Sequence, residues 1–250
     1  MAYWRTPGGD ITYCISVLAI LFIGPIPVAA QTEQRRITYG AETDFVSGYV
    51  WHGILESDKP AMEAEAWISG SGFTFTAWSS LDLANRSESA NLTYRRDWGK
   101  LRLEPSVEAY LNHPPAGVHD PASMEAALKL SYPAGPFRVF AIHAFDVMAH
   151  RGAYYGEAGL AYESRIKKNT VLAASLYAGW ASSKFNDVYI GLRKPAFNFV
   201  GAEGSLTYYV SRSLYFQPHF ELSKIADRRL REYLPRPSVF NFGLAMGVEF

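Results

Sequence analysis

The chain contains one cysteine, has no excess of either charge, and has no long apolar run after residue 30. One thiol cannot form an internal bridge, which excludes a disulfide-stapled secreted domain. The 24 basic and 24 acidic residues balance, whereas a nucleic-acid-binding protein would show a basic excess. Hydrophobic residues make up 48% of the chain and aromatic residues 15%, so a disordered chain is also excluded.

The amino terminus has the pattern of an export signal. Residues 14–30 form an apolar run that follows Arg5 and is interrupted by Pro25 and Pro27. This run is shorter than the ~20 residues that a membrane-spanning helix needs. The small side chains of Val28 and Ala30 suit a signal peptidase, so we predict a signal peptide over residues 1–30 with cleavage after Ala30. The predicted mature chain, residues 31–250, contains no cysteine.

The mature chain is built from segments that alternate between apolar and small or polar residues. The clearest is the last, which carries Phe240, Phe242, Leu244, Met246, Val248 and Phe250 at every second position. Such a pattern predicts a β-strand with one apolar face. We predict about twelve strands, most of them about ten residues long or more, which suits a tilted strand that crosses a membrane. The spans are 37–54, 60–69, 73–83, 89–98, 101–112, 123–132, 137–149, 152–164, 170–182, 197–210, 213–225 and 238–250.

Two further features favour a membrane barrel over a soluble sandwich. Connections alternate between short turns and longer loops, with the longest at 113–122, 183–196 and 226–237. Outer-membrane barrels have short periplasmic turns and longer external loops. Aromatic residues also gather at predicted strand ends, where barrels of this kind carry rings of them. They are Phe73, Trp98, Tyr132, Phe137, Tyr162, Tyr208, Tyr209, Tyr215 and Phe250.

If the apolar faces meet lipid, the opposite faces line the lumen. That set contains many carboxylates and few basic groups. Its predicted members are Glu42, Asp44, Glu63, Glu65, Arg95, Arg102, Glu104, Glu108, Glu125, Lys129, Glu157, Glu203, His219 and Glu221. One interpretation is a narrow pathway that favours cations. The other is a plugged barrel whose charges pair across the interior, with inward-pointing Tyr110, Tyr155, Tyr177, Tyr209 and Trp67 filling the bore.

Two segments suggest contacts with other components of the envelope. The loop 226–237 carries Arg228, Arg229, Arg231 and Arg236, which either bridge lipopolysaccharide phosphates or form a solvated basic loop. The last strand, with its terminal Phe250, is similar to the signal by which barrel-assembly machinery recognises its clients.

The histidines give little support for an enzyme. A membrane hydrolase needs a Ser–His pair at the lipid boundary, and an omptin-type protease needs His and acidic residues at the outer rim. His119, Asp120, Asp146 and His150 fall near that predicted rim without matching a motif. His143 lies on the segment 137–149, whose phase the pattern leaves open. No metal-ligand spacing is present, and no cofactor is predicted.

A resemblance adds to this interpretation. Residues 42–54 read ETDFVSGYVWHGI, residues 57–61 read SDKPA and residues 71–80 read SGFTFTAWSS. This stretch resembles the opening of the TorF-like porin family of proteobacterial outer membranes. The resemblance implies a transport or channel role and supplies no catalytic residues.

The sequence as a whole predicts a transmembrane antiparallel up-and-down β-barrel in a Gram-negative outer membrane, acting as a small porin or passive solute channel. The runner-up is a non-conducting structural or adhesion barrel that binds lipopolysaccharide or partners, and the third is a membrane-embedded hydrolase. The predicted partners are membrane lipids, lipopolysaccharide, the assembly machinery and small solutes.

Overall fold

The computed structural model describes residues 37–82, 86–113 and 121–250. All of them belong to one of two compact units, Arg36–Phe250. The predicted signal peptide and its cleavage site lie outside the described residues and stay a prediction.

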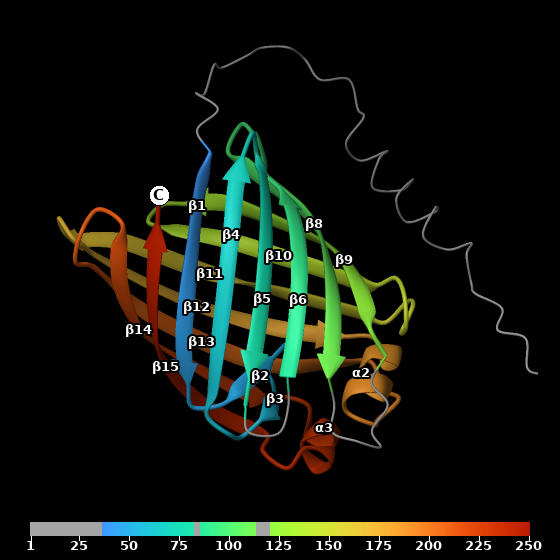
Figure 1. The fold of residues 1–250 in the computed structure, drawn as a ribbon. Helices are drawn as coiled ribbons and strands as arrows, with labels where there is room; N and C mark the ends of the chain where they lie inside the picture. Colours follow the sequence, from blue (N-terminus) through green and yellow to red (C-terminus); the bar gives the residue numbers. More distant parts are fainter. Residues whose placement is uncertain (1–36, 83–85, 114–120) are drawn as a thin grey trace, which may run out of the picture. The chain divides into compact units, whose positions relative to one another are not determined.

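The described chain folds into a closed antiparallel β-barrel (Figure 1). Strands β6 and β7 both pair with β8 in one register, so they form a single barrel strand interrupted at Arg95, and the barrel has twelve strands. The barrel strands are β1 (Thr38–Val46), β4 (Ala61–Gly70), β5 (Phe73–Leu81), β6 (Arg86–Tyr94) with β7 (Arg96–Trp98), β8 (Leu101–His113), β9 (Ser123–Ala134), β10 (Phe137–Asp146), β11 (Tyr154–Lys167), β12 (Thr170–Ala181), β13 (Ala196–Tyr209), β14 (Leu214–Ile225) and β15 (Ser238–Glu249).

The barrel closes where the first and last strands meet. β1 pairs with β15 on one side and β4 on the other. The amide of Phe250 donates to the carbonyl oxygen of Tyr39 at 2.9 Å, and the amide of Tyr39 donates back to Phe250 at 3.1 Å. Closure therefore leaves no unpaired sheet edge, which a barrel inside a membrane requires.

The connections sort by length as the sequence predicts. At one end, the short-turn end, β-strands are joined by residues 71–72, 99–100, 135–136, 168–169 and 210–213. At the opposite end, the long-loop end, the connections include 47–60, 182–195 and 226–237. The β4–β5 turn is a two-residue type in which Ser71 (φ 54°) and Gly72 (φ 85°) both have positive φ, matching the twist of the flanking strands.

The outer face of the barrel is apolar. On β15, Phe240, Phe242 and Leu244 are exposed on the outside, whereas the intervening Asn241 and Ala245 are buried inside. The inward face of β15 is made of small residues because large side chains of β14 lie over it. A Cβ on Gly243 would come within 2.3 Å of the His219 ring, and one on Gly247 within 2.3 Å of the Tyr215 ring. The predicted orientation of this strand is confirmed.

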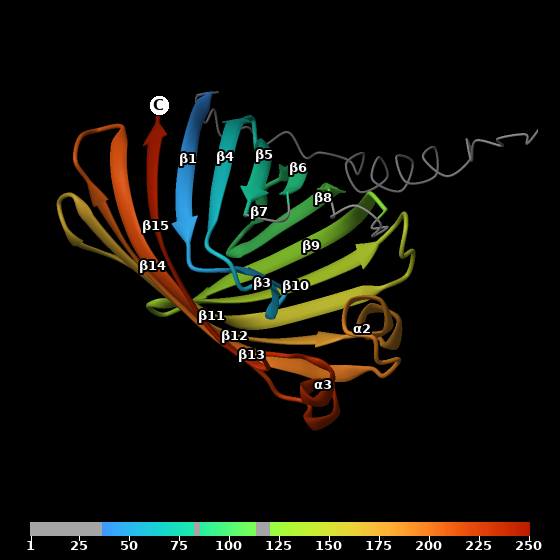
Figure 2. The ribbon, with the colours of Figure 1, turned by 60° about the horizontal axis from the view of Figure 1, so that its bottom comes forward.

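The prediction of one long first strand over 37–54 is wrong. β1 ends at Val46, and the chain turns into the barrel as a small hairpin, β2 (Tyr49–Trp51) and β3 (Ile54–Ser57) (Figure 2). His52 (φ 48°) and Gly53 (φ 75°) make the tip of this hairpin. A Cβ on Gly53 would lie 2.5 Å from the Phe199 ring, so glycine is needed there both for its backbone angle and for its lack of a side chain.

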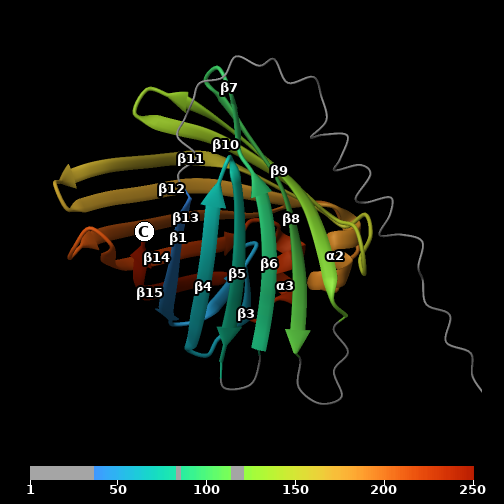
Figure 3. The ribbon, with the colours of Figure 1, turned by 45° about the horizontal axis from the view of Figure 1, so that its top comes forward.

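Two of the long loops contain short helices. The loop after β12 forms α2 (Ser183–Tyr189), and the loop after β14 forms α3 (Arg228–Tyr233) (Figure 3). Ser182 caps α2 by accepting a hydrogen bond from the amide of Phe185, and Asp227 caps α3 through the amides of Arg229 and Leu230. Among the described residues, no helix is long and apolar enough to cross a membrane.

Candidate functional site

The interior of the barrel carries carboxylates that lie side by side on neighbouring strands. In the strand register, Glu42 lies opposite Glu65 and Asp44 lies opposite Glu63, both between β1 and β4. Two more opposed pairs are Glu108 with Glu125 and Glu203 with Glu221. Like charges at directly opposed positions are destabilising, so these pairs need donors or cations nearby.

Tyrosine hydroxyls supply many of these donors. The hydroxyl of Tyr215 donates to Glu42 at 2.6 Å, that of Tyr155 to Glu157 at 2.5 Å and that of Tyr177 to Glu221 at 3.0 Å. Tyr110 donates to Glu125 at 3.1 Å, and Ser175 donates to Glu203 at 2.7 Å. The predicted inward direction of Tyr110, Tyr155 and Tyr177 agrees with these bonds. Tyr215, predicted as part of the interfacial ring, lies inside instead. Its hydroxyl reaches over β15 to the carboxylate of Glu42 on β1.

Of the predicted basic lumen residues, Arg95 and Arg102 lie close to the short turn at residues 99–100, whereas Lys129 lies in the middle of β9. Lys129 lies opposite Glu104 in the β8–β9 register, and its ammonium lies 5.5 Å from the ring centre of Phe140. Arg102 donates to Asp97 at 2.9 Å. Arg95 lies at the break between β6 and β7 and is exposed. The remaining basic residue of the predicted lumen set, His219, lies in the middle of β14, and its Nε2 is 2.8 Å from the carboxylate of Asp44.

The β2–β3 hairpin occupies part of the lumen. Its Trp51 stacks on Phe185 of α2 with ring centres 5.7 Å apart, and its His52 stacks on Tyr155 at 3.8 Å. The hydroxyl of Ser223 on β14 donates to the Gly53 carbonyl at 2.9 Å. The Nε2 of His52 also lies 3.8 Å from the carboxylate of Glu125. The hairpin is thus fixed to strands on more than one side of the barrel.

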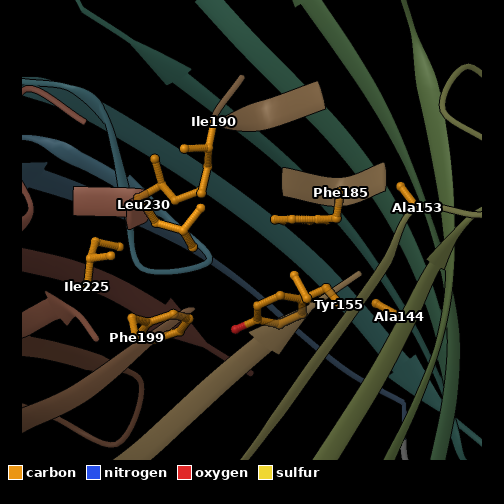
Figure 4. Close-up of a cluster of buried hydrophobic side chains, with 10 residues drawn as sticks. Ala144, Ala153, Tyr155, Phe185, Ile190, Phe199, Ile225 and Leu230 are labelled. Atoms are coloured by element: carbon orange, nitrogen blue, oxygen red, sulfur yellow. The ribbon is translucent and has the colours of Figure 1, made fainter. Parts of the chain in front are cut away.

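A cluster of buried apolar side chains joins the hairpin, α2 and α3 to the barrel wall at the long-loop end (Figure 4). Phe185 of α2, Leu230 of α3, Phe199 of β13 and Ile225 of β14 are almost fully buried in it. A register shift at Gly179 and Trp180 accompanies the burial of Phe199, which lies opposite Gly179. We call this cluster, which also includes Ile54, Ala144, Ala153, Tyr155, Ala181 and Ile190, the apolar plug.

A buried pair of amides joins the α2 loop to the barrel wall. The side-chain amide of Asn198 donates to Asn186 at 2.7 Å, and Asn186 donates back at 3.2 Å. Asn186 also donates to the carbonyl oxygen of Lys194 at 2.7 Å. Because both amides are buried and satisfied, this pair holds the loop in a single arrangement.

The hairpin separates two cavities in the lumen. The first, of about 510 Å³, lies between the hairpin and strands β4 to β8, and its lining includes Glu63, Glu65 and Glu108. The second, of about 440 Å³, lies against β1 and β11 to β15, and its lining includes Asp44, Glu203 and Glu221. Tyr49, Val50 and Glu63 border both. The apolar plug therefore fills one region, and carboxylate-lined space remains beside the hairpin; the choice between a conducting and a plugged barrel stays a prediction.

The basic loop at 226–237 is held by ion pairs. Lys194 donates to Asp227, and Arg236 lies 2.9 Å from Asp58 in the loop that follows the β2–β3 hairpin. The Lys194 ammonium, together with the α3 amides, holds the pKa of the Asp227 carboxyl below its usual value. Arg228, Arg229 and Arg231 are carried by α3, and their contact with lipopolysaccharide stays a prediction.

Removing the cap of α3 should loosen this loop. Replacing Asp227 with Ala removes both the cap and the ion pair, which should increase trypsin cleavage at the α3 arginines roughly five-fold, corresponding to the loss of about 1 kcal/mol. Asp227→Asn keeps a good cap and should show a smaller effect.

The stability of this loop should also depend on pH. Because the pKa of Asp227 is lowered in the folded protein, its carboxylate stabilises the loop at neutral pH, and this contribution disappears as the pH falls through that pKa. Cleavage of refolded protein by an acid-active protease against pH measures this, with exposed Glu232→Gln on α3 as the control. Equal cleavage of all variants would contradict it.

The phase of β10 is decided by the exposed residues beside His143. Val139 and Phe145 are exposed on the outside, whereas Phe140 and Ala144 are buried inside, so His143 is on the outer face. Its Nδ1 lies 2.8 Å from the hydroxyl of Tyr154, which also accepts a bond from the Trp180 indole at 3.0 Å. Since the tyrosine accepts from Trp180, it can donate its own proton to His143.

In the part of the chain that the structure describes, His143 is not joined to the residues that a hydrolase or protease would need. Its hydrogen-bond partner is a tyrosine rather than the serine of a hydrolase. Asp146 accepts bonds from Ser123 and from the amides of Met148 and His150, so it caps a turn at the end of β10. His119 and Asp120 lie outside the described residues. Within the described parts of the chain, no group of three or more His, Asp or Glu residues is arranged to hold a metal ion.

The residues of the predicted assembly signal lie on the last strand. Phe240, Phe242, Leu244 and Met246 are exposed on the outer face of β15, and Phe250 is exposed at the short-turn end. Val248, at the same phase, lies opposite Leu214 of β14. Their recognition by assembly machinery stays a prediction.

The sequence did not predict the tyrosine–glutamate bonds or the residues that hold the hairpin in place. The hairpin does carry a local signal, since the dipeptide His52-Gly53 can adopt positive φ at a tight turn. Of the tyrosine partners, Tyr155 and Glu157 are two positions apart on one strand, whereas Tyr215 and Glu42 are 173 positions apart and carry no local signal.

Comparison with known proteins supports the fold and assigns no family. The NanC porin aligns with a TM-score of 0.53 at 11% identity, over 85% of this chain and 98% of that one. The KdgM porin aligns with a TM-score of 0.49 at 10% identity, and an outer membrane channel from Pseudomonas putida F1 with 0.47 at 10% identity. These cover 85% and 91% of this chain, and 98% and 100% of the other chains. No protein-family model matches the chain, and no curated protein matches its sequence. The likeness to the NanC porin, with a TM-score above 0.5, shows a transmembrane β-barrel fold and nothing beyond the fold.

Proposed function

We propose that the protein is a narrow passive channel for small solutes in the outer membrane of a Gram-negative bacterium, and that it favours cations. The observation that carries this proposal is the set of carboxylates bordering both cavities beside the hairpin, with Glu63 shared between them. Acidic side chains around a narrow path lower the free energy of an entering cation and raise that of an anion. The resemblance to the TorF-like porin family, which is likewise a proposal, implies the same role.

The direction of the barrel follows from its connections. Outer-membrane barrels place short turns in the periplasm and long loops outside. In that orientation, both ends of the barrel domain are periplasmic, and the apolar plug with α2 and α3 faces the exterior. A solute from outside would then pass the hairpin before it reaches the basic residues near the short-turn end.

The second candidate is a barrel that does not conduct. It is favoured by the apolar plug and by the hairpin, which together fill part of the lumen with well-packed side chains. In this case, the long loops would be the functional surface, and the predicted contact of Arg228, Arg229, Arg231 and Arg236 with lipopolysaccharide would be the main interaction.

Conductance in a planar bilayer distinguishes the two candidates. The refolded protein should give discrete channel events, and a salt gradient should give a reversal potential of the sign that potassium permeation produces. The triple variant Glu63→Gln, Glu65→Gln, Glu108→Gln should lower the ratio of potassium to chloride permeability roughly three-fold, because it removes carboxylates from the first cavity. The exposed Glu232→Gln should leave the ratio unchanged. An absence of channel events across salts and voltages would reject the channel.

A further inference from the structure

The first cavity differs from the second in the side chains that surround it. Its lining includes four aromatic residues besides three glutamates: Tyr49, Trp51, Trp78 and Tyr110. The second cavity has a more polar lining, with Gln217, Asn241 and His219, the last beside Asp44. The second cavity also has carboxylates and aromatic rings, among them Tyr162 and Phe220, but its described lining contains no tryptophan, so the pair Trp51 and Trp78 is what distinguishes the first cavity.

The aromatic residues come in two pairs, each joining the hairpin to the barrel wall. Tyr49 of β2 and Trp78 of β5 have ring centres 5.4 Å apart with an angle of 35° between their planes. Trp51 of β2 and Tyr110 of β8 have ring centres 6.3 Å apart and are nearly perpendicular, at 82°. The hairpin thus adds two rings to the two on the wall, and all four border the cavity.

The described residues that border this cavity include no lysine or arginine, and His52 is their one basic side chain. Glu108 lies 3.4 Å from the amide nitrogen of Asn91, which is a neutral donor. His52 at one edge is turned toward Glu125, at 3.8 Å, rather than toward the three glutamates of the lining. Several carboxylates close together in a partly buried space are costly, and a cation among them would offset that cost.

We propose that this cavity is a binding site for an organic ammonium ion, and that such ions are the solute class of the proposed channel. The inference rests on the proposed function for its role in transport. A methylated or primary ammonium is attracted to the negative faces of aromatic rings, most strongly those of tryptophan and tyrosine, and also to carboxylates. A small hard cation would instead require a close shell of oxygen ligands, which the rings cannot supply. A cavity of about 510 Å³ accommodates a small ammonium ion together with water.

The choice of probe separates charge from shape. Choline and 3,3-dimethyl-1-butanol have nearly the same size and shape, but only choline carries a positive charge. We expect calorimetric titration of the refolded protein in detergent at constant ionic strength to show saturable choline binding. The neutral alcohol should bind at least about ten-fold more weakly, since it loses both the cation–π and the carboxylate attraction.

Variants of the lining test the site itself. Trp78→Leu and Glu65→Gln should each weaken choline binding, whereas Trp98→Leu and Glu232→Gln, both at exposed positions away from the cavity, should not. Tyr49→Leu changes the hairpin instead of the barrel wall, so it provides a second aromatic test if Trp78→Leu does not refold. Folding of each variant is followed by the mobility shift on heating that folded barrels show in detergent gels.

The outcomes separate this inference from the proposed function. Choline binding that depends on Trp78 and Glu65 supports the site even if no conductance is observed, and the channel alone would then be rejected. A potassium-selective conductance without preference for choline over the neutral alcohol overturns the site and leaves the channel standing. Equal binding by all variants also overturns it.

Discussion

Deleting residues 49–57 and joining Gly48 to Asp58 should increase the single-channel conductance at least roughly two-fold, because the hairpin stands between the two cavities of the lumen. The new bond between Gly48 and Asp58 needs little rearrangement of the chain. A Cβ placed on Gly48 would lie 4.0 Å from the Cα of Asp58, so the two ends of the deleted segment are already close. The barrel strands on either side, β1 and β4, keep their own pairing of nine residue pairs.

A single substitution should act in the same direction. Gly53→Val would place a side chain within 2.5 Å of the Phe199 ring at a residue with φ of 75°, which should dislodge the hairpin tip from the apolar plug. Gly99→Val is the matched control, since Gly99 also has a positive φ of 61° but has open space around it. An unchanged conductance in both the deletion and Gly53→Val would show that the hairpin does not limit the flow.

Placing a charge on the outer face should be the most damaging substitution in the barrel. Leu176 lies near the middle of β12 and is 63% exposed on the apolar face. Leu176→Arg should destabilise the folded protein by about 2–4 kcal/mol, the cost of an arginine at the bilayer midplane. Reversible urea unfolding in lipid vesicles, followed by tryptophan fluorescence, measures this difference.

The control places the same charge on the inner face. Thr76 lies in the middle of β5 and borders the first cavity, so Thr76→Arg has water and carboxylates around it. We expect its effect on the free energy of unfolding to be much smaller than that of Leu176→Arg. Similar destabilisation by the two arginines would contradict the assignment of the two faces, on which the lumen, the plug and the cavities all depend.

The first strand, which the sequence predicted too long, and β10, whose phase it left open, both contact the apolar plug. Trp51 and Ile54 look like the continuation of a lipid-facing strand, but they turn inward, where Ile54 belongs to the apolar plug and Trp51 packs against it. An apolar side chain gives the same pattern whether it meets lipid or another part of the protein. For this reason, alternation alone extended the first strand past Val46.

The same cause explains the ambiguity of β10. Its outer face carries Val139 and Phe145, and its inner face carries Phe140 and Ala144, of which Ala144 belongs to the plug. With apolar residues on both faces, a period of two cannot identify the inner one. His143 was therefore assigned to the outer face only by the three-dimensional arrangement, which also joins it to Tyr154 and Trp180.

What the sequence determines by itself is local: where strands alternate, where turns interrupt them, and which face of most strands carries charge. These features depend on residues within about ten positions of one another, so they are readable along the chain. The tertiary structure decided how the hairpin enters the lumen, which tyrosine meets which carboxylate, and where the aromatic cavity forms. Most of these contacts join residues far apart in sequence, such as the Ser223 hydroxyl and the Gly53 carbonyl, which meet only when the barrel closes.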